Sequence, residues 1–299
     1  MSYRADTVVI LGLGLIGGSL ARALRQSGFS KRFIGCGHRE PSLRRGVELG
    51  VIDDFTLDLD EAMRLADILV ICTPTLIAAD TLREILARQS EGETIITDVA
   101  SVKGKLRDAA IEAAGYMPPQ LVLAHPIAGS EQSGVEASSA GLFVNHRVIL
   151  TPVEGNNPAA VELIRRMWAS TGAEVVDMAV DDHDAVLAAT SHLPHLLAYA
   201  LVDALAQSPA SEDIFRFAAG GFRDFTRIAS SDPAMWRDIA IANKSAVLNA
   251  IDMFGEHLAL LRQAVERGDA EQLFATFSRA KQARDEFASI LAGRGQGKP

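Results

Sequence analysis

The feature that most constrains the fold is a glycine-rich stretch near the start of the chain. Residues 8–11 are apolar and predict a buried parallel strand. Gly12, Gly14 and Gly17 then form a Gly-x-Gly-x-x-Gly motif, and residues 19–24 continue at helical spacing. In a dinucleotide-binding unit the first glycine permits a tight turn, the second lets a pyrophosphate approach, and the third lets the helix pack closely on the strand.

The start of the expected helix adds a second reason to predict dinucleotide binding. The backbone N–H groups of Leu15 and Ile16 would face the phosphates, where the helix dipole also places partial positive charge. A second strand over residues 32–36 completes the pattern. The alternative is a glycine-rich turn in an α/β protein that binds no nucleotide.

The end of the second strand bears on the choice of cofactor. NAD enzymes usually place an acidic residue about 20 residues after the glycine loop, where it binds the ribose 2′-hydroxyl. Gly37 occupies that position here, and His38 and Arg39 follow it. This arrangement favours a 2′-phosphate, so NADP is the expected cofactor. Alternatively, Glu40 binds the ribose or Arg39 stacks on the adenine, and the protein uses NAD or both.

The composition limits the partners and the compartment. With 299 residues, 48% of them hydrophobic, the chain can form two domains with substantial cores. A formal net charge of −9 argues against a nucleic-acid partner. Cys36 and Cys72 form neither a disulfide framework nor a metal site, which favours a cytoplasmic protein. The apolar run over residues 7–21 is too short for a membrane span and no other stretch reaches that length, so no membrane partner is expected.

Strands and helices alternate through the first 178 residues, which is typical of a doubly wound parallel sheet. A helix is expected over residues 41–49, and further strands over residues 67–72, 94–99, 121–124, 147–150 and 174–177. The fold class is therefore α/β, with a Rossmann-type dinucleotide-binding domain over residues 1–179.

Only helices are expected after that point, in a helical substrate and dimerisation domain over residues 180–299. The segments with helical patterns are residues 182–206, 213–228, 233–267 and 269–291. A helix as long as the third of these usually packs against a partner as well as its own neighbours. It therefore predicts a homodimer through the helical domain.

Ligands of open α/β sheets bind at the carboxyl ends of the strands. This rule selects Thr73 with Pro74, the segment Ser101–Lys103, and His125 with the residues that follow it. A neutral imidazole can accept the hydroxyl proton of an alcohol that loses hydride, so His125 is the candidate base. The alternative is a hydrogen-bonded structural histidine.

The helical half adds candidates for substrate binding. His192 and His195 have a spacing that resembles a metal pair, but no carboxylate or cysteine completes a metal site. Arg223 and Arg227 are four residues apart, on one face of the expected helix, and arginine suits bidentate carboxylate recognition. Alternatively, both arginines are solvated and pair with nearby aspartates. Trp236 adds an aromatic wall.

Taken together, these residues resemble the prephenate and arogenate dehydrogenases of tyrosine biosynthesis. The resemblance extends from about residue 8 to residue 244, and the motifs that carry it cover residues 9–19, 97–103, 125–134, 191–195, 221–229 and 232–238. It implies NAD(P)-dependent oxidative decarboxylation of prephenate, arogenate or both, giving 4-hydroxyphenylpyruvate or tyrosine.

The resemblance also implies a role for each candidate. His125 would bind the ring hydroxyl and accept its proton, and Ser101 would hydrogen-bond the same hydroxyl or His125. Arg227 would bind a substrate carboxylate. The other residues that would form the pocket are Glu131, His195 and Trp236. Because the chain leaves little room for a regulatory domain, tyrosine inhibition is expected to act at the active site.

Two alternatives to this function remain open from the sequence. A β-hydroxyacid dehydrogenase also joins a Rossmann domain to a helical one, and Lys244 would be its candidate acid/base residue. A non-catalytic NADP-binding sensor would keep the glycine loop without needing His125, Ser101 and Arg227 together. Gly37 departs from the acidic residue of the family's NAD-using members, and no residue decides between prephenate and arogenate, so we expect both to be accepted.

Overall fold

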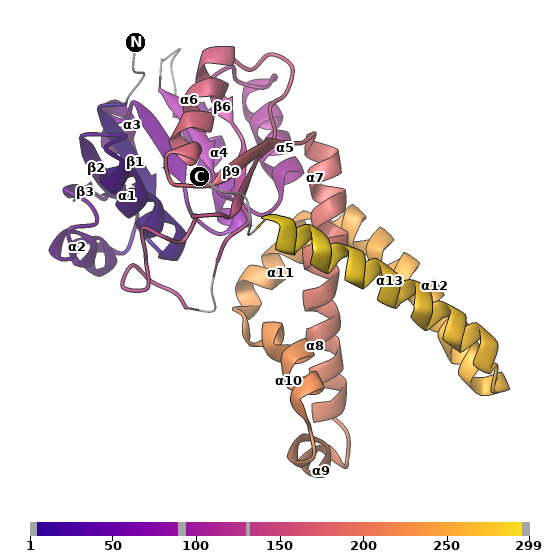
Figure 1. The fold of residues 1–299 in the computed structure, drawn as a ribbon. Coiled ribbons are helices and arrows are strands. Elements are labelled where there is room, and N and C mark those ends of the chain that lie inside the picture. Colours follow the sequence, from indigo (N-terminus) through magenta and orange to yellow (C-terminus); the bar gives the residue numbers. More distant parts are fainter. Residues whose placement is uncertain (1–4, 89–93, 130–131, 295–299) are drawn as a thin grey trace. The chain divides into compact units, whose positions relative to one another are not determined.

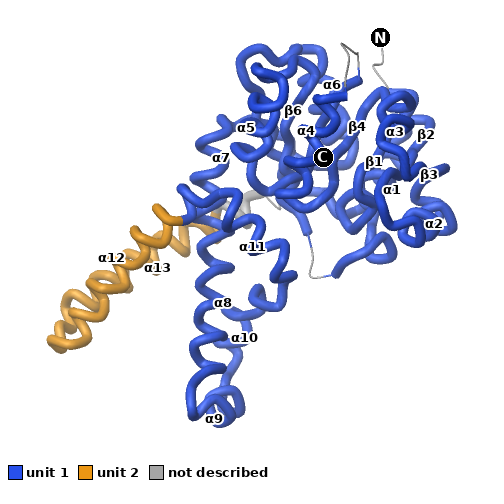
Figure 2. The backbone as a smooth tube through the Cα atoms, turned by 180° about the vertical axis from the view of Figure 1, so that it is seen from behind, with its two compact units in different colours: residues 1–247 blue, residues 248–299 orange. Residues whose placement is uncertain are grey.

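The structure, a computed structural model, describes residues 5–88, 94–129 and 132–294. The chain forms two compact units, residues 1–247 and 248–299 (Figure 2). The first unit contains both sheets and the helices as far as the start of the last helical pair. The domain boundary that the sequence predicts after residue 179 stays a prediction.

Six parallel strands form the main sheet, in the order β3-β2-β1-β4-β5-β6 (Figure 1). Their bounds are β1 Thr7–Leu11, β2 Arg32–Cys36, β3 Asp54–Thr56, β4 Ile68–Ile71, β5 Ile95–Asp98 and β6 Leu121–Val122. The expected Rossmann-type architecture, followed by helices, is confirmed. The short strand β3 is an element that the sequence analysis did not anticipate.

Helices cover both faces of this sheet, which is why its strands are almost continuously apolar. Along β1, Val8 and Ile10 join one hydrophobic cluster while Val9 and Leu11 join the other, as the alternation of side chains in a strand requires. The helices of this part are α1 Leu15–Ser27, α2 Glu40–Glu48, α3 Leu59–Leu65, α4 Thr75–Arg88, α5 Lys103–Ala114 and α6 Pro158–Ala169.

A second sheet has three strands, in the order β7-β8-β9. They are β7 Ala124–Pro126, β8 Arg147–Leu150 and β9 Glu174–Asp177, and β7 runs antiparallel to β8. The single strand predicted over residues 121–124 was therefore wrong, because this segment is divided between β6 in the main sheet and β7 in the second sheet. The chain leaves the main sheet at Leu123 because the backbone of Ala124 bonds to the side chains of Asp98 and Lys103.

The helices of the second half are more interrupted than the sequence predicts. They are α7 Val180–Leu187, the π-helix η1 Ala188–His192, α8 Leu193–Ala206, α9 Ser211–Arg216, α10 Gly220–Thr226, the 3₁₀ helix η2 Arg227–Ser230, α11 Pro233–Ala242, α12 Lys244–Arg267 and α13 Ala270–Arg294. The π-helix ends two residues before Pro194, which has no N–H to continue a regular α-helical ladder.

Two predicted helices are divided. The segment over residues 213–228 is divided into α9, α10 and η2. The division fits the low helix propensity of glycine, because Gly220 and Gly221 stand at the start of α10. The helix predicted over residues 233–267 breaks at Asn243, where α11 ends and α12 follows. The Asn243 side chain donates to the carbonyl of Asp184, so a tertiary contact accompanies the break.

The segment Val180–Ala206 is long and apolar enough to cross a membrane, with a mean hydropathy of 1.4 over its most apolar window. The expectation that no further stretch reaches such a length was wrong, because α7, η1 and α8 follow one another without a break. Length and composition alone do not separate a membrane span from a helix packed within a protein. Here His183 and His192, inside the segment, are buried and hydrogen-bonded to other parts of the chain.

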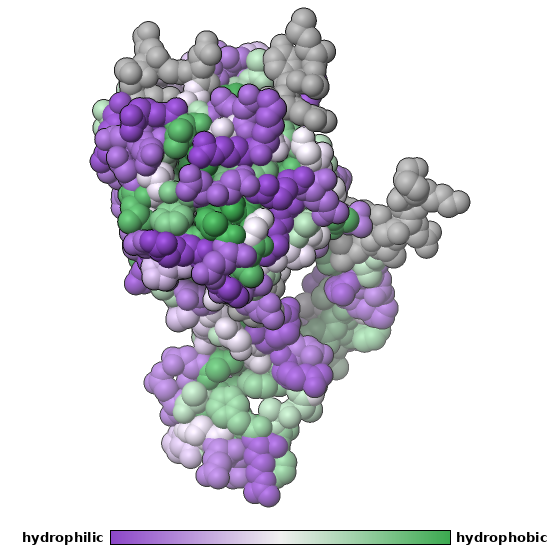
Figure 3. Space-filling view, turned by 90° about the vertical axis from the view of Figure 1, so that its left-hand side faces the viewer, coloured by the Kyte–Doolittle hydropathy of each residue, from purple (hydrophilic) through white to green (hydrophobic). Residues whose placement is uncertain are grey.

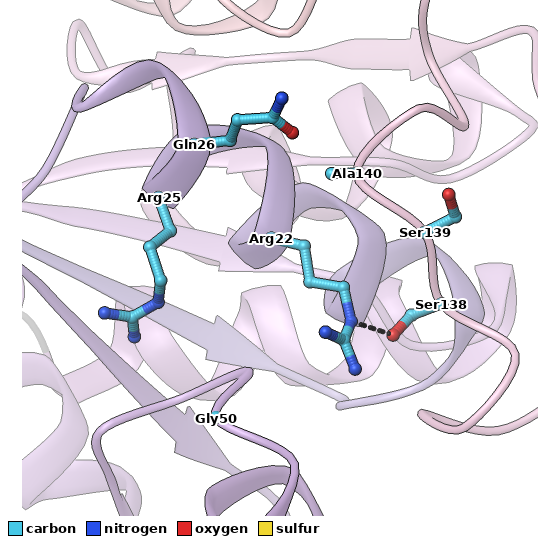
Figure 4. Close-up of a pocket in the computed structure, with 7 residues that line it drawn as sticks. All are labelled: Arg22, Arg25, Gln26, Gly50, Ser138, Ser139 and Ala140. Atoms are coloured by element: carbon cyan, nitrogen blue, oxygen red, sulfur yellow. Dashed lines mark hydrogen bonds between the residues drawn. The ribbon is translucent and has the colours of Figure 1, made fainter.

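A loop that follows residue 131 docks on α1. The backbone N–H of Ser139 donates to Ser19 Oγ at 2.9 Å. Arg22 Nε donates to Ser138 Oγ at 2.9 Å (Figure 4). Gly18 makes this close approach possible, because a Cβ there would lie 2.9 Å from Ser138 Cβ. The cavity beside these contacts has a volume of about 450 Å³, and none of the predicted site residues lines it.

Candidate active site

The glycine loop has the geometry that the sequence predicts. Gly12 has a φ of +93°, and a Cβ there would lie 2.9 Å from Thr73 Cγ2. A Cβ on Gly17 would lie 2.6 Å from the carbonyl oxygen of Gly12 and 2.7 Å from Ile10 Cγ2. Gly14, in contrast, faces open space. Gly12 and Gly17 are thus required by packing, whereas Gly14 leaves room for a ligand.

Two further features of this loop fit a dinucleotide. The N-terminus of α1 has no side-chain cap, so the N–H groups of Leu15 and Ile16 are free to meet an anion. Thr73 lies just beyond the carboxyl end of β4, and its buried Oγ1 has no hydrogen-bond partner among the described residues. Since buried polar groups are normally paired, this hydroxyl is available to a ligand that binds at the carboxyl end of β4. The exposed Pro74 follows and precedes α4.

The end of β2 is open. A Cβ at Gly37 would meet nothing within 4 Å, and His38 and Arg39 are both exposed. Arg39 is the N-cap residue of α2, while Glu40 accepts hydrogen bonds from Arg44 at 2.9 and 2.5 Å. The carboxylate that could have bound a ribose is therefore engaged with a neighbouring cation.

His125 lies inside β7 rather than after a strand, and its side chain is buried. Its Nδ1 lies 2.9 Å from Nε2 of His183, and Nδ1 of His183 lies 2.8 Å from Oδ1 of Asp184. Burial, together with the nearby His183, Lys103 and His192, lowers the pKa of His125 well below its ordinary value. The imidazole is therefore neutral near pH 7 and able to accept a proton.

A buried ion pair places the strand that carries His125. Lys103 and Asp98 are both fully buried, and the lysine Nζ donates to Asp98 and, at 2.6 Å, to the carbonyl of Ala124. The carboxylate of Asp98 accepts the N–H of Ala124 at 3.1 Å and that of Ala100 at 2.9 Å. Ser101 lies between the two charged residues in sequence, in the turn before α5. The pair thus holds the Ser101 turn and the start of β7 together.

The helical half contributes a second group of side chains. His195 stacks on Trp236 with ring centroids 3.6 Å apart, and its Nδ1 lies 2.9 Å from the carbonyl oxygen of Ser191. Burial and the charge of Arg227 lower the pKa of His195, although the bond to Ser191 opposes them. Trp236 Nε1 is buried and has no hydrogen-bond partner among the described residues. This group of side chains therefore combines a cation, an imidazole and an indole N–H.

The remaining candidates are placed as follows. Arg223, in α10, is largely exposed and pairs with Asp224 at 3.3 Å, whereas Arg227 begins η2. Glu131 lies outside the described residues. Lys244, the candidate acid/base residue of a β-hydroxyacid dehydrogenase, is exposed at the first residue of α12.

Four residues link the two groups, and the sequence predicted no catalytic or binding role for them: Asn243, Asp184, His192 and His183. Asn243 donates to the carbonyl of Asp184 at 2.8 Å, and its Nδ2 lies 3.2 Å from Nδ1 of His192. Burial lowers the pKa of His192 to about 4. His192 in turn packs edge-on against Trp236. The only sequence signal for His183 and Asp184 was an acidic first turn of helix, which is common.

Among the described residues, no group of three or more His, Cys, Asp and Glu side chains could hold a metal ion.

The Rossmann-type sheet, the open glycine loop and a buried neutral histidine define this chain as a nicotinamide-dependent dehydrogenase. Two family models match it: the nucleotide-binding domain of prephenate dehydrogenase over residues 20–177, and the dimerization domain of prephenate dehydrogenase over residues 179–279. The chain belongs to the prephenate dehydrogenase family, whose members are oxidoreductases.

Similar proteins cover nearly the whole chain. The prephenate dehydrogenase of Bacillus subtilis is 40% identical over 291 residues, which are 95% of this chain and 77% of that protein. The cyclohexadienyl dehydrogenase of Zymomonas mobilis is 35% identical over 93% of this chain and 94% of its own. Among solved structures, prephenate dehydrogenase from A. aeolicus in complex with hydroxyphenyl propionate and NAD+ is 37% identical. It matches with a TM-score of 0.89 over 96% of this chain and 100% of that one.

Proposed function

We propose that this protein catalyses the NAD(P)-dependent oxidative decarboxylation of prephenate, arogenate or both, in tyrosine biosynthesis. The observation that carries the proposal is the buried, neutral His125, held beside the Ser101 turn by the Asp98–Lys103 pair. When bound, a nicotinamide dinucleotide accepts the hydride that leaves the carbinol carbon. The ring carboxylate departs as CO2, and aromatisation of the ring makes the step effectively irreversible.

His125 accepts the proton of the ring hydroxyl as hydride leaves the same carbon. A general base of this kind contributes about 10²- to 10⁴-fold to a rate. Ser101 hydrogen-bonds the same hydroxyl or His125, which orients the substrate. The low pKa of His125 keeps the imidazole in its basic form at neutral pH.

Arg227 binds a substrate carboxylate, and His195 and Trp236 shape the surrounding pocket together with Glu131. Support comes from the stack of His195 on Trp236 and from the effect of Arg227 on the pKa of His195. Loss of CO2 is favoured when its carboxylate is not over-stabilised in the ground state. A single arginine therefore orients the substrate more than it neutralises it.

For the cofactor we propose a preference for NADP over NAD. Gly37 provides no carboxylate to repel a 2′-phosphate, Glu40 is engaged by Arg44, and the cationic Arg39 is exposed beside the open end of β2. The pyrophosphate would lie against Gly14 and the N-terminus of α1.

We further propose a soluble cytoplasmic homodimer that forms through the helical part. Large apolar side chains are exposed on these helices, as the lower part of Figure 3 shows for one face. Those of α8 to α11 are Leu201, Phe215, Phe217, Phe225, Met235 and Ile241, and a dimer interface would cover such side chains. Both cysteines are free thiols, which fits a reducing compartment. Inhibition by tyrosine, the product of arogenate, would act at the active site.

The experiment that tests the function is a two-by-two assay of prephenate and arogenate with NAD and NADP. We expect turnover of at least one substrate, with higher kcat/KM for NADP, and a loss of about 10²- to 10⁴-fold in kcat for His125→Asn. The Lys244→Met variant is the matched control and should keep full activity. Absence of turnover with every pair would refute the function, and a His125→Asn variant with normal turnover would refute the role of the base.

A further inference from the structure

We propose that His183 and Asp184 form a positioning pair that fixes the tautomer of His125, with the ring proton on Nδ1 and the accepting lone pair on Nε2. This inference rests on the proposed function only where it states that the Nε2 lone pair accepts the proton of the substrate hydroxyl. The hydrogen-bond chain itself follows from the contacts of the three side chains.

The chain of bonds has a direction because it begins at a carboxylate. Asp184 accepts the backbone N–H of Lys103 at 2.9 Å through Oδ1 and that of Gly104 at 2.8 Å through Oδ2. Burial by itself raises the pKa of Asp184, but the bonds from His183 and from these two N–H groups outweigh it, and the net shift is downward. An ionised carboxylate can only accept, so Nδ1 of His183 donates to it.

The tautomer of His125 follows from that of His183. Burial lowers the pKa of His183 against the opposing bond to Asp184, so its ring is neutral and carries one proton, on Nδ1. Its Nε2 is then an acceptor, and Nδ1 of His125, 2.9 Å away, must donate to it. Nε2 of His125 is left without a proton, as a base that receives a hydroxyl proton requires.

A doubly protonated His183 would reverse the direction of its hydrogen bond to His125, because it would donate from both nitrogens. The charged and titratable groups that act on His183 and His125 are Lys103, Asp98, Asp184 and His192. Lys103, at the start of α5, is buried with Asp98, at the end of β5, and the positive charge of Lys103 disfavours a cationic imidazole at either position. The carboxylates of Asp184 and Asp98 favour the cationic form of His183, but burial and Lys103 outweigh them, so its pKa is lowered and the ring is neutral.

The same carboxylate also fixes the turn that carries Ser101. Its two acceptor bonds go to the first two residues of α5, and a Cβ at Gly104 would lie 2.7 Å from Asp184 Oδ2. The glycine is needed for this approach. Asp184 thus orients both side chains proposed to meet the ring hydroxyl, His125 through His183 and Ser101 through the N-terminus of α5.

Two substitutions of His183 separate positioning from packing. His183→Leu fills the site with an apolar side chain but removes the acceptor, so His125 can adopt either tautomer, and we expect kcat to fall about 10- to 100-fold with KM for the dinucleotide unchanged. His183→Gln places an amide oxygen near the position of Nε2 and should restore kcat to within about fivefold of the wild type. Asp182→Asn, on the exposed neighbouring residue, is the control and should change neither constant.

The tautomer itself is measured by ¹⁵N NMR of histidine-labelled protein without substrate, with the His125 signals assigned from their absence in His125→Asn. We expect a protonated Nδ1 and an unprotonated Nε2 in the wild type, and loss of this pattern in His183→Leu. A protonated Nε2 in the wild type, or an unchanged pattern in a folded His183→Leu, would overturn the inference. Because no substrate is present, inactivity toward prephenate and arogenate would refute the proposed function without altering this result.

Discussion

Lys103→Met is the substitution whose consequence follows most directly from the structure. Lys103 is fully buried, and its ammonium group is bonded to Asp98 and to the carbonyl of Ala124. Methionine has a similar length and keeps the site filled, so the loss is mainly electrostatic. The variant leaves the carboxylate of Asp98 buried with only the N–H groups of Ala100 and Ala124 as donors.

The expected cost is about 3–5 kcal/mol in the free energy of unfolding, the usual cost of leaving one partner of a buried ion pair without the other. A factor of ten in the unfolding equilibrium corresponds to about 1.4 kcal/mol, so the equilibrium shifts by about two to four powers of ten. Removing both charges, in Asp98→Asn/Lys103→Met, leaves no buried ion, and the loss should be at most about 2 kcal/mol.

The assay is urea unfolding followed by circular dichroism, at one fixed protein concentration because dimerisation would contribute to stability. Lys105→Met, in the same helix and only partly buried, is the matched control and should change the free energy of unfolding by less than about 0.5 kcal/mol. The reasoning is refuted if Lys103→Met costs less than about 1 kcal/mol, or if the double variant is less stable than the single one.

Three further predictions concern the dinucleotide and the base. Gly17→Ala should lower the free energy of unfolding by about 1–3 kcal/mol, because its Cβ meets the backbone oxygen of Gly12. Gly14→Ala should leave stability unchanged in urea unfolding but raise the dissociation constant of the dinucleotide; equal stability losses in the two variants would contradict this. Gly37→Asp places a carboxylate in open space, so the ratio of kcat/KM for NAD to that for NADP should rise at least tenfold, about 1.4 kcal/mol; an unchanged ratio would exclude this position from ribose recognition. Protonation of His125 abolishes its role as a base and its pKa is lowered, so kcat/KM should stay level as the pH falls through about 6.5 and decline only below it. If kcat/KM falls to half its maximum at about pH 6.5 or above, the pKa of His125 is not lowered and the prediction is wrong.

The sequence alone was sufficient for the dinucleotide unit, because its determinants are local. The apolar residues 8–11 and the spacing of Gly12, Gly14 and Gly17 predict a strand, a tight turn and a helix, and β1 and α1 follow that order. The strand predicted over residues 32–36 coincides with β2. The first helix ends at Gly28, which has a φ of +65° that favours glycine. Each of these features depends on residues within a few positions of one another.

The arrangement of the candidate base, His125, depended on the tertiary structure. The sequence predicts His125 as a candidate at a strand end, but its strand belongs to a second sheet because Asp98 and Lys103 bind the backbone of Ala124 from another part of the chain. His183 is 58 residues away from His125 in sequence. No periodicity relates two such positions, because only the folded chain brings them together.

The helical half shows the same difference between what local sequence patterns predict and what tertiary contacts decide. Apolar spacing predicted helices there and could not show the break at Asn243, which coincides with a side-chain bond to the carbonyl of Asp184, 59 residues away. Periodicity reports which face of a segment is buried, whereas a buried polar side chain bonds to whatever group the fold brings within about 3 Å. The sequence by itself therefore determined the class of fold and the position of the glycine loop. Only the tertiary structure decided that Nδ1 of His125 meets His183, from which we propose Nε2 as the nitrogen that accepts the proton.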